Sequence, residues 1–171
     1  MLVLKLLIRL PKWLDEPFRK IFTKKQKMIA AIRIRGLVGK TKDLNNTFLR
    51  LRLRKKHVCV LLPEKPEAKG MLKKVKDYIT YGEIDKGTLK QLIEKRGRLI
   101  GDKKVEKLED GFVDDLLAGK VKLQDAKIKP FFRLHPPRKG FGRGGIKRPI
   151  KEKGALGYRG KDINVLIKKM L

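Results

Sequence analysis

A basic segment broken repeatedly by glycine and proline places the strongest constraint on the fold. This segment, Phe131–Gly160, reads FFRLHPPRKGFGRGGIKRPIKEKGALGYRG and holds nine lysines and arginines against one acid, Glu152. It has too few apolar residues to offset the entropy lost when it becomes ordered, so it cannot build a core of its own. We therefore expect the rest of the chain to form a scaffold that holds this segment against a polyanion.

The composition of the chain points to the same kind of partner. Its 171 residues suffice for one hydrophobic core with at most a small second lobe. The 46 Lys and Arg against 18 Asp and Glu give a net charge of +28, and self-repulsion of this size destabilises a compact monomer unless a polyanion neutralises it. Nucleic acid is the first candidate and an anionic membrane surface the second. No apolar run reaches the roughly 20 residues that a bilayer span requires.

The first expected strand begins at Ile29 and is half-buried, with a basic outer side. Its residues alternate between two faces, Ala30, Ile32 and Ile34 on one and Ala31, Arg33 and Arg35 on the other. Thr41 can cap the helix that follows, in which Leu44 and Phe48 recur at helical spacing. The positive charge after this helix exceeds what a helix end requires, through Arg50, Arg52, Arg54, Lys55 and Lys56.

Two further strands and a second helix are expected next. Val58–Leu62, which includes the single cysteine Cys59, is a nearly continuous apolar run and predicts a central strand with the thiol in the core. Residues 66–70 bridge to a helix, and residues 79–84 have the composition of a third strand. The order β-α-β-α-β suggests a small sheet covered on one face by two helices, which is an α+β fold.

The region after residue 85 is expected to be mainly helix and loop. Thr88 and Gln91 have the spacing of a capping box, Gly97 can end the helix that they open, and Gly119 can end a second one. Acids gather between residues 102 and 125, either as a face turned from the polyanion or as an ordinary solvated helix surface. A last helix repeats apolar residues at helical spacing, namely Ile163, Leu166, Ile167 and Met170.

This last helix and a strand at residues 131–134 would pin the basic segment at both ends. Phe131 and Phe132 are expected to anchor it to the core, whereas Phe141 and Tyr158 are expected to stack on unpaired RNA bases. We further expect residues 140–145 to become rigid only against RNA.

No arrangement of residues favours catalysis or a cofactor. Gly140, Gly142 and Gly145 spell G-x-G-x-x-G, but a dinucleotide site needs a strand before the glycines and a helix after them. Here two cations and Pro149 follow, so we interpret the glycines as backbone that can approach phosphates. The two histidines, His57 and His135, have no spaced Cys, His or carboxylate partners, so we expect neither a metal site nor an acid-base pair.

Several separate motifs resemble one family of ribosomal proteins. VKDYITYGEIDKGTLKQLIEKRGRLIGDKKV (residues 75–105), FRLHPPRKGFGRGGIKRP (132–149) and GALGYRG (154–160) look like the archaeal long form of large-subunit ribosomal protein thirty, counted as seven in eukaryotes. IRIRGLVG (32–39) is similar to the strand-loop-helix start shared with the short bacterial form. The resemblance covers Met28–Leu171.

The resemblance implies a three-stranded antiparallel sheet related to the ferredoxin-like fold, with a C-terminal extension. It also implies a non-catalytic constituent of the large ribosomal subunit, in the cytoplasm, that binds large-subunit rRNA near the 5S rRNA and contacts neighbouring ribosomal proteins. No cofactor, small-molecule substrate or membrane is implied. The chain is accordingly divided into a basic N-terminal extension (1–27), a β-α-β-α-β core (28–84) and the extension with the basic segment (85–171).

Residues 1–27 have no counterpart in the family. Either Met28 is the true start of the protein and the preceding residues come from the gene model, or they form a lineage-specific extension. Their apolar run carries Lys5 and Arg9 and stops at Pro11, so an amphipathic helix at a membrane surface is the rival to an unstructured basic arm.

The predicted RNA interface consists of two groups of residues. The first group is Arg33, Arg35, Lys40, Arg50, Arg54, Lys55 and Lys56. The second group is Arg133, Arg138, Lys139, Phe141, Arg143, Lys147, Arg148, Tyr158 and Arg159. A membrane-surface protein and an RNA-modifying enzyme are the alternatives, and the second lacks any recognisable catalytic residues.

Overall fold

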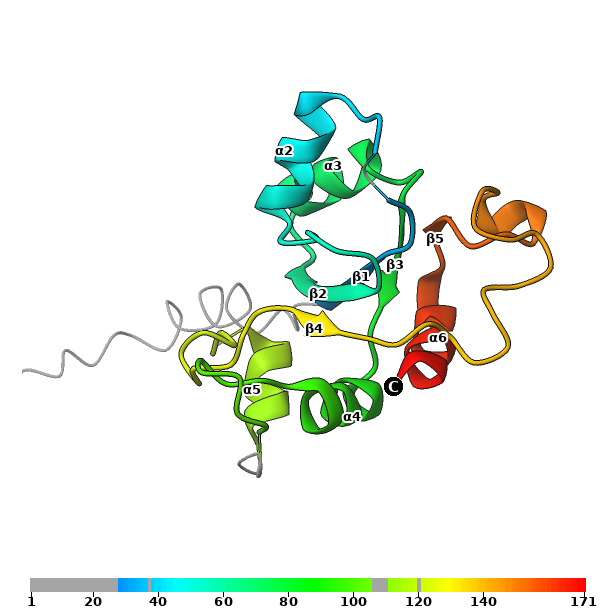
Figure 1. The fold of residues 1–171 in the computed structure, drawn as a ribbon. Coiled ribbons are helices and arrows are strands. Elements are labelled where there is room, and N and C mark those ends of the chain that lie inside the picture. Colours follow the sequence, from blue (N-terminus) through cyan, green and yellow to red (C-terminus); the bar gives the residue numbers. More distant parts are fainter. Residues whose placement is uncertain (1–27, 37, 106–110, 120) are drawn as a thin grey trace, which may run out of the picture.

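A five-stranded sheet forms the centre of the molecule. The computed structural model describes residues 28–36, 38–105, 111–119 and 121–171. The strands lie in the order β4-β2-β1-β3-β5 (Figure 1). Their bounds are β1 Met28–Arg33, β2 Val58–Pro63, β3 Ile79–Glu83, β4 Phe132–Arg133 and β5 Gly157–Tyr158. β1 pairs antiparallel with β2 and β3, β2 pairs antiparallel with β4, and β3 pairs parallel with β5.

The central strand β1 is buried on both faces, so the prediction of a half-buried strand with a basic outer side is wrong. Ala30 and Ile32 pack into one apolar cluster, while Ile29 and Ala31 pack into a second cluster on the opposite face. Helices cover both faces of the sheet, and a strand in that setting needs apolar or internally bonded residues at every position. Arg33 meets this requirement through hydrogen bonds, which are described below.

Two helices cover the first face, α2 (Lys42–Arg50) and α3 (Pro66–Lys74). Thr41 is the N-cap residue of α2 as predicted, but its side chain makes no capping hydrogen bond. The predicted bridge over residues 66–70 is wrong, because Pro66 begins α3, where its fixed φ suits a first helical position. The order β-α-β-α-β and the antiparallel pairing of the three core strands are confirmed.

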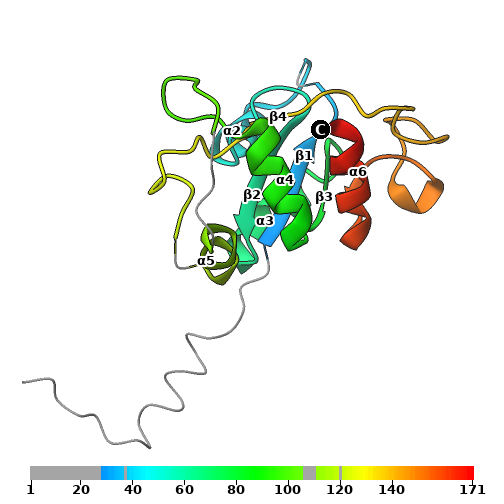
Figure 2. The same cartoon turned by 90° about the horizontal axis from the view of Figure 1, so that it is seen from below.

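The opposite face is covered by α4 (Lys86–Arg96) and α6 (Ile163–Met170), which lie beside each other in Figure 2. The expectation that the two helices of the core cover one face is confirmed, and the helices of the C-terminal extension cover the other. The predicted capping box is also wrong, since α4 begins after Asp85 and Thr88 is buried within it. Gly97 ends the helix as predicted, and a Cβ at this position would lie 2.2 Å from the Ile93 carbonyl oxygen.

The remaining helix, α5 (Phe112–Ala118), ends at Gly119 as predicted, with a left-handed φ of 73° that favours glycine. The four apolar residues predicted to face inward from α6 are all buried. The acids around α5 make local pairs: Asp114 with Lys86, and the Asp125 carboxylate with the Lys122 backbone N–H. Asp102 differs, because it lies among cations rather than on a face turned away from them.

β4 and β5 hold the basic segment at its two ends. The arm, which we define as residues 134–156, leaves β4 and returns to β5 beside α6, and it projects to one side of the molecule (Figure 1). Phe132 is fully buried in the cluster on the α4 side, and Phe131 is partly buried against the cluster on the α2 side, so the predicted anchoring is confirmed. A Cβ on Gly82 of β3 would lie 2.1 Å from the Gly160 carbonyl oxygen, so the returning chain packs directly on the sheet backbone.

The first expected domain lies outside the described residues. Segments on both sides of the expected boundary at residue 84 contribute strands to one sheet, and the division itself stays a prediction. Within the part of the chain that the structure describes, no helix has the length and apolar character to cross a membrane.

Candidate nucleic-acid interface

The edge of the sheet at β4 brings together cations from both predicted groups, Arg54 and Lys55 from the first and Arg133 from the second. Arg133 pairs with Val58 in the sheet, and the Leu134 N–H donates to the His57 carbonyl oxygen at 3.0 Å. The chain before β2 therefore lies beside β4. A hollow of about 500 Å³ results, which we call the edge hollow, and its lining residues are Arg52, Arg54, Lys55, Val58, Pro130, Phe131 and Arg133.

A sharp turn after α2 directs side chains into the edge hollow. Leu51 and Leu53 are buried, whereas Arg52 and Arg54 are exposed, so the turn alternates between the core and the surface. Arg52 has a left-handed φ of 59°, and the Leu53 N–H donates to the Phe48 carbonyl oxygen at 2.9 Å. The buried leucines hold the cations close together against their mutual repulsion.

A second basic hollow lies on the other side of Arg133. We call it the hairpin hollow; its volume is about 330 Å³ and its lining residues are Arg96, Arg98, Asp102, Lys129, Phe131 and Arg133. Arg133 stacks over the Phe131 ring at 5.9 Å and so reaches both hollows. The predicted interface omitted Arg52, although this residue was noted in the basic run after the first helix, and it omitted Arg96, Arg98 and Lys129 as well. The run KRGR at residues 95–98 was the available signal for Arg96 and Arg98.

A third hollow, the arm hollow of about 320 Å³, forms where the arm passes α6. It brings Lys139 and Arg159 together with Lys169 of α6. The Arg138 N–H donates to the Lys169 carbonyl oxygen at 3.0 Å, which fixes the start of the arm on this helix. Arg159 is half-buried, and burial lowers the pKa of its guanidinium although Asp162 opposes that shift.

Arg33 is placed differently from the other predicted residues. Only 3% of it is exposed, and its guanidinium donates to the carbonyl oxygens of Arg35 and Leu53 at 2.9 Å each and to that of Arg54. The guanidinium also lies over the Phe48 ring, 5.1 Å from its centroid, and burial lowers its pKa. Arg33 therefore holds the turn after α2 in place from inside, and we leave it out of the interface.

Two more residues of the first group lie away from the edge hollow. The Arg35 guanidinium and the Lys40 ammonium lie over the Tyr78 ring, at 5.2 and 4.8 Å from its centroid. Both are partly buried. The remaining predicted cations are exposed, namely Arg50, Lys56, Arg138, Arg143, Lys147 and Arg148.

The two predicted stacking aromatics differ in accessibility. Phe141 is partly buried and stacks on His57 with ring centroids 5.9 Å apart. Tyr158 is 57% exposed and tilts against Tyr81 at 5.6 Å. Tyr158 therefore offers a face for stacking, whereas Phe141 has part of its surface already occupied by the protein.

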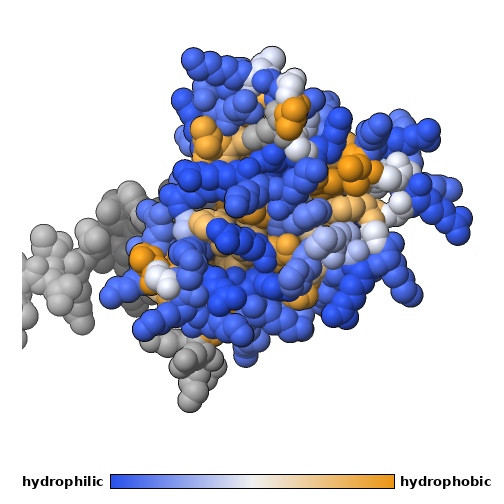
Figure 3. Space-filling view, in the orientation of Figure 1, coloured by the Kyte–Doolittle hydropathy of each residue, from blue (hydrophilic) through white to orange (hydrophobic). Residues whose placement is uncertain are grey.

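The described residues show no group of three or more His, Cys, Asp and Glu side chains that could hold a metal ion. Cys59 is fully buried as predicted, and burial raises the pKa of its thiol to about 12. The face in view in Figure 3 is covered mainly by hydrophilic residues, with smaller apolar patches between them.

Comparisons with known proteins identify the family. The model of the family "Ribosomal protein L30p/L7e" matches residues 29–79. Large ribosomal subunit protein uL30 of Methanococcus vannielii is 51% identical over 151 residues, which cover 83% of this chain and 98% of the relative. The chain belongs to the L30p/L7e family.

Other archaeal members of the L30p/L7e family agree with this assignment. The uL30 proteins of Nanoarchaeum equitans and Methanopyrus kandleri are 46% and 44% identical, over 82% and 81% of this chain and 96% and 100% of the relatives. Membership gives the chain a structural, non-enzymatic role in the ribosome, which is cytoplasmic in archaea. The predicted family, its archaeal form and the lack of enzymatic activity are thereby confirmed.

Proposed function

We propose that this chain is a constituent of the large ribosomal subunit that binds large-subunit rRNA through the surface around β4. The observation that carries the proposal is the edge hollow, in which cations from the turn after α2 meet Arg133 with no acid among the lining residues. The printed names of the relatives, large ribosomal subunit protein uL30, support the same assignment.

The cations of the edge hollow suit the phosphates of the RNA backbone. Arginine binds phosphate oxygens through two parallel N–H groups, and three of the four cations here are arginines. The arm extends this surface with Arg138, Lys139, Arg143, Lys147 and Arg148, and its glycines allow close approach of the backbone. Proximity to the 5S rRNA and contacts with neighbouring ribosomal proteins complete the proposal; they rest on the family resemblance.

The salt dependence of RNA binding tests the edge hollow directly. We compare the triple variant Arg54→Gln, Lys55→Gln, Arg133→Gln with a control of equal charge, Lys73→Gln, Lys76→Gln, Lys90→Gln, on a large-subunit rRNA fragment. Each lost phosphate contact lowers the slope of log affinity against log salt by roughly 0.7 to 0.9. We therefore expect the slope to fall by about 2 to 3 in the first variant only. Equal slopes in the two variants would show that the edge hollow is not the RNA contact.

The arm is tested separately by neutralising three of its exposed cations. In the variant Arg138→Gln, Lys139→Gln, Arg143→Gln we expect a similar fall in slope, because these side chains face solvent near the arm hollow. An unchanged slope here, together with a reduced slope in the edge-hollow variant, would confine the interface to β4 and the turn after α2.

A further inference from the structure

The hairpin hollow contains one acid among its four cations, and that acid is held in place by the backbone. Residues 98–104 form a tight hairpin in which Arg98 pairs with Lys104. The Leu99 N–H donates to the Lys103 carbonyl oxygen at 2.9 Å, and the Asp102 N–H donates to the Leu99 carbonyl oxygen at 3.0 Å. The turn thus places the Asp102 side chain on the side of the hairpin that faces β4.

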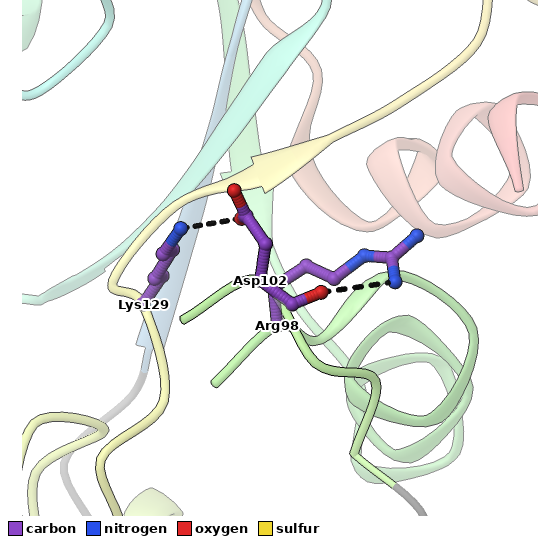
Figure 4. A network of polar contacts seen from close by, with 3 residues as sticks. All are labelled: Arg98, Asp102 and Lys129. Carbon is purple, nitrogen blue, oxygen red and sulfur yellow. Dashed lines mark hydrogen bonds and ion pairs between the residues drawn. The ribbon is translucent and has the colours of Figure 1, made fainter. Parts of the chain in front are cut away.

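A second set of backbone bonds brings Lys129 to this carboxylate. The Ile100 N–H donates to the Lys127 carbonyl oxygen at 3.0 Å, and the Lys129 N–H donates to the Arg98 carbonyl oxygen at 2.8 Å. The Lys129 ammonium then donates to Asp102 Oδ1, while an Arg98 Nη donates to the Asp102 backbone carbonyl at 3.4 Å (Figure 4). The position of the ion pair therefore follows from the register of two backbone segments.

The four cations of the hollow favour a negative charge at the place of this carboxylate. The hydrogen bond and charge of Lys129 hold the pKa of Asp102 below its ordinary value, and the charges of Arg133 and Arg98 add to that effect. The Asp102 side chain is 75% exposed, whereas the Lys129 side chain is only 25% exposed. An ion pair with one partner this exposed contributes little to stability.

We propose that the hairpin hollow binds one phosphate of the RNA backbone and that the Asp102 carboxylate occupies this place in the free protein. The phosphate would displace the carboxylate from Lys129, in a hollow that Arg98 and Arg133 also line. This inference rests on the proposed function and names a residue that weakens RNA binding. In a chain of charge +28, such a competitor lowers the fraction of protein that is occupied by weakly bound RNA. The rRNA that fills all three hollows binds tightly enough to displace the carboxylate, so the competitor favours this RNA over others.

The decisive experiment compares two acids that each pair with a lysine. Asp102→Asn removes the competitor and retains a residue that tolerates the left-handed φ of 63° at this position. Asp114→Asn is the control, because it removes the same charge from an exposed pair with Lys86 outside the hollow. With a short single-stranded RNA of unrelated sequence at low salt, we expect Asp102→Asn to bind about threefold more tightly than wild type. Asp114→Asn should bind within about 1.5-fold of wild type, as a general charge effect requires.

The gain must depend on Lys129. The double variant Asp102→Asn, Lys129→Gln should bind no more tightly than Lys129→Gln alone.

In wild-type protein, carbon-13 NMR of the Asp102 carboxyl should show its pKa rising when RNA binds, because its bond to Lys129 is lost. A gain equal to that of Asp114→Asn, or one that persists without Lys129, would overturn the inference. If Asp102→Asn matches its control while the edge-hollow variant still loses affinity, this inference alone fails; if the edge-hollow variant loses nothing, the proposed function fails.

Discussion

Arg33 in the centre of the sheet and Arg133 at its edge show two uses of the same side chain. Each closes a strand and each lies over a phenylalanine ring. Arg33 is 3% exposed and bonded to three backbone carbonyl oxygens, whereas Arg133 is exposed between two hollows. The comparison teaches that position in the sheet, rather than charge, decides whether an arginine of this chain supports the fold or faces a partner.

The largest expected effect is the loss of stability when Arg33 is removed. Arg33→Ala should lower the free energy of unfolding by about 3 kcal/mol, because it leaves buried carbonyl oxygens without donors and opens space beneath Phe48. Arg133→Ala, at an exposed position, should change it by no more than about 0.5 kcal/mol. Urea unfolding measures the free energy of unfolding of both variants. Similar losses in the two would contradict the distinction between an arginine that supports the fold and one that faces a partner.

The next effect concerns the contact that joins the returning arm to the sheet. In Gly82→Ala the new Cβ would lie 2.1 Å from the Gly160 carbonyl oxygen, so β3 and the chain after β5 must separate, at a cost of about 2 kcal/mol. Gly87→Ala in α4 is the matched control, since no atom lies within 4 Å of its Cβ. It should stabilise the protein by up to about 1 kcal/mol. Equal unfolding free energies for the two variants would contradict the packing at Gly82.

Arg159 is intermediate between the two arginines and should show both behaviours. It is half-buried and donates to Thr80 Oγ1 and the Ala155 carbonyl oxygen at 3.4 and 3.5 Å, yet it also lines the arm hollow. For Arg159→Gln we expect a loss of about 1 kcal/mol in unfolding free energy. The salt slope of RNA binding should also fall, by roughly 0.7 to 0.9. A loss of stability alone would show that Arg159 only supports the fold, as Arg33 does. A lower salt slope alone would show that it only faces RNA, as Arg133 does.

The smallest effect involves His57, which joins the turn after α2 to the arm through its stack on Phe141. Burial first, and then the charge of Lys56, lower the pKa of His57 from 6.5. The unfolded chain therefore binds this proton more readily, so stability is complete above the unfolded pKa and is lost as pH falls through the folded one. Wild type should lose roughly 0.3 kcal/mol more than His57→Asn between about pH 8 and about pH 5, after allowance for solvent screening. Urea midpoints at the two pH values measure this, and parallel changes would contradict it.

The sequence predicted those elements whose pattern is local. The three core strands, α6 and the anchoring phenylalanines follow from periodicity and composition, since each pattern fits within a few residues. β5 was not predicted, because two residues carry no period and become a strand only by pairing with β3. The burial of Arg33 was missed for a related reason: helices on both faces of the sheet leave no outer side, and that arrangement depends on α4 and α6, which come much later in the chain.

The candidate interface was predicted as two groups of cations but not as a surface. Arg54 and Arg133 meet only because β4 pairs with β2, a contact between distant parts of the sequence. The hairpin hollow joins residues from α4, the hairpin and the chain before β4, each of which reads as ordinary solvated charge when taken alone. Which of these residues contact rRNA stays a prediction.

The parallel pairing of β5 with β3 also bears on how the protein folds. Thr80 Oγ1 donates to the Gly157 carbonyl oxygen, a contact between residues 77 positions apart in the chain, and the pairing itself is two residues long. Closing so long a loop for so few bonds is slow, because the entropy is lost before the contacts form. The three central strands with α2 and α3, which are close in sequence, should therefore form first. The arm should then take up its place late, after the central strands have formed.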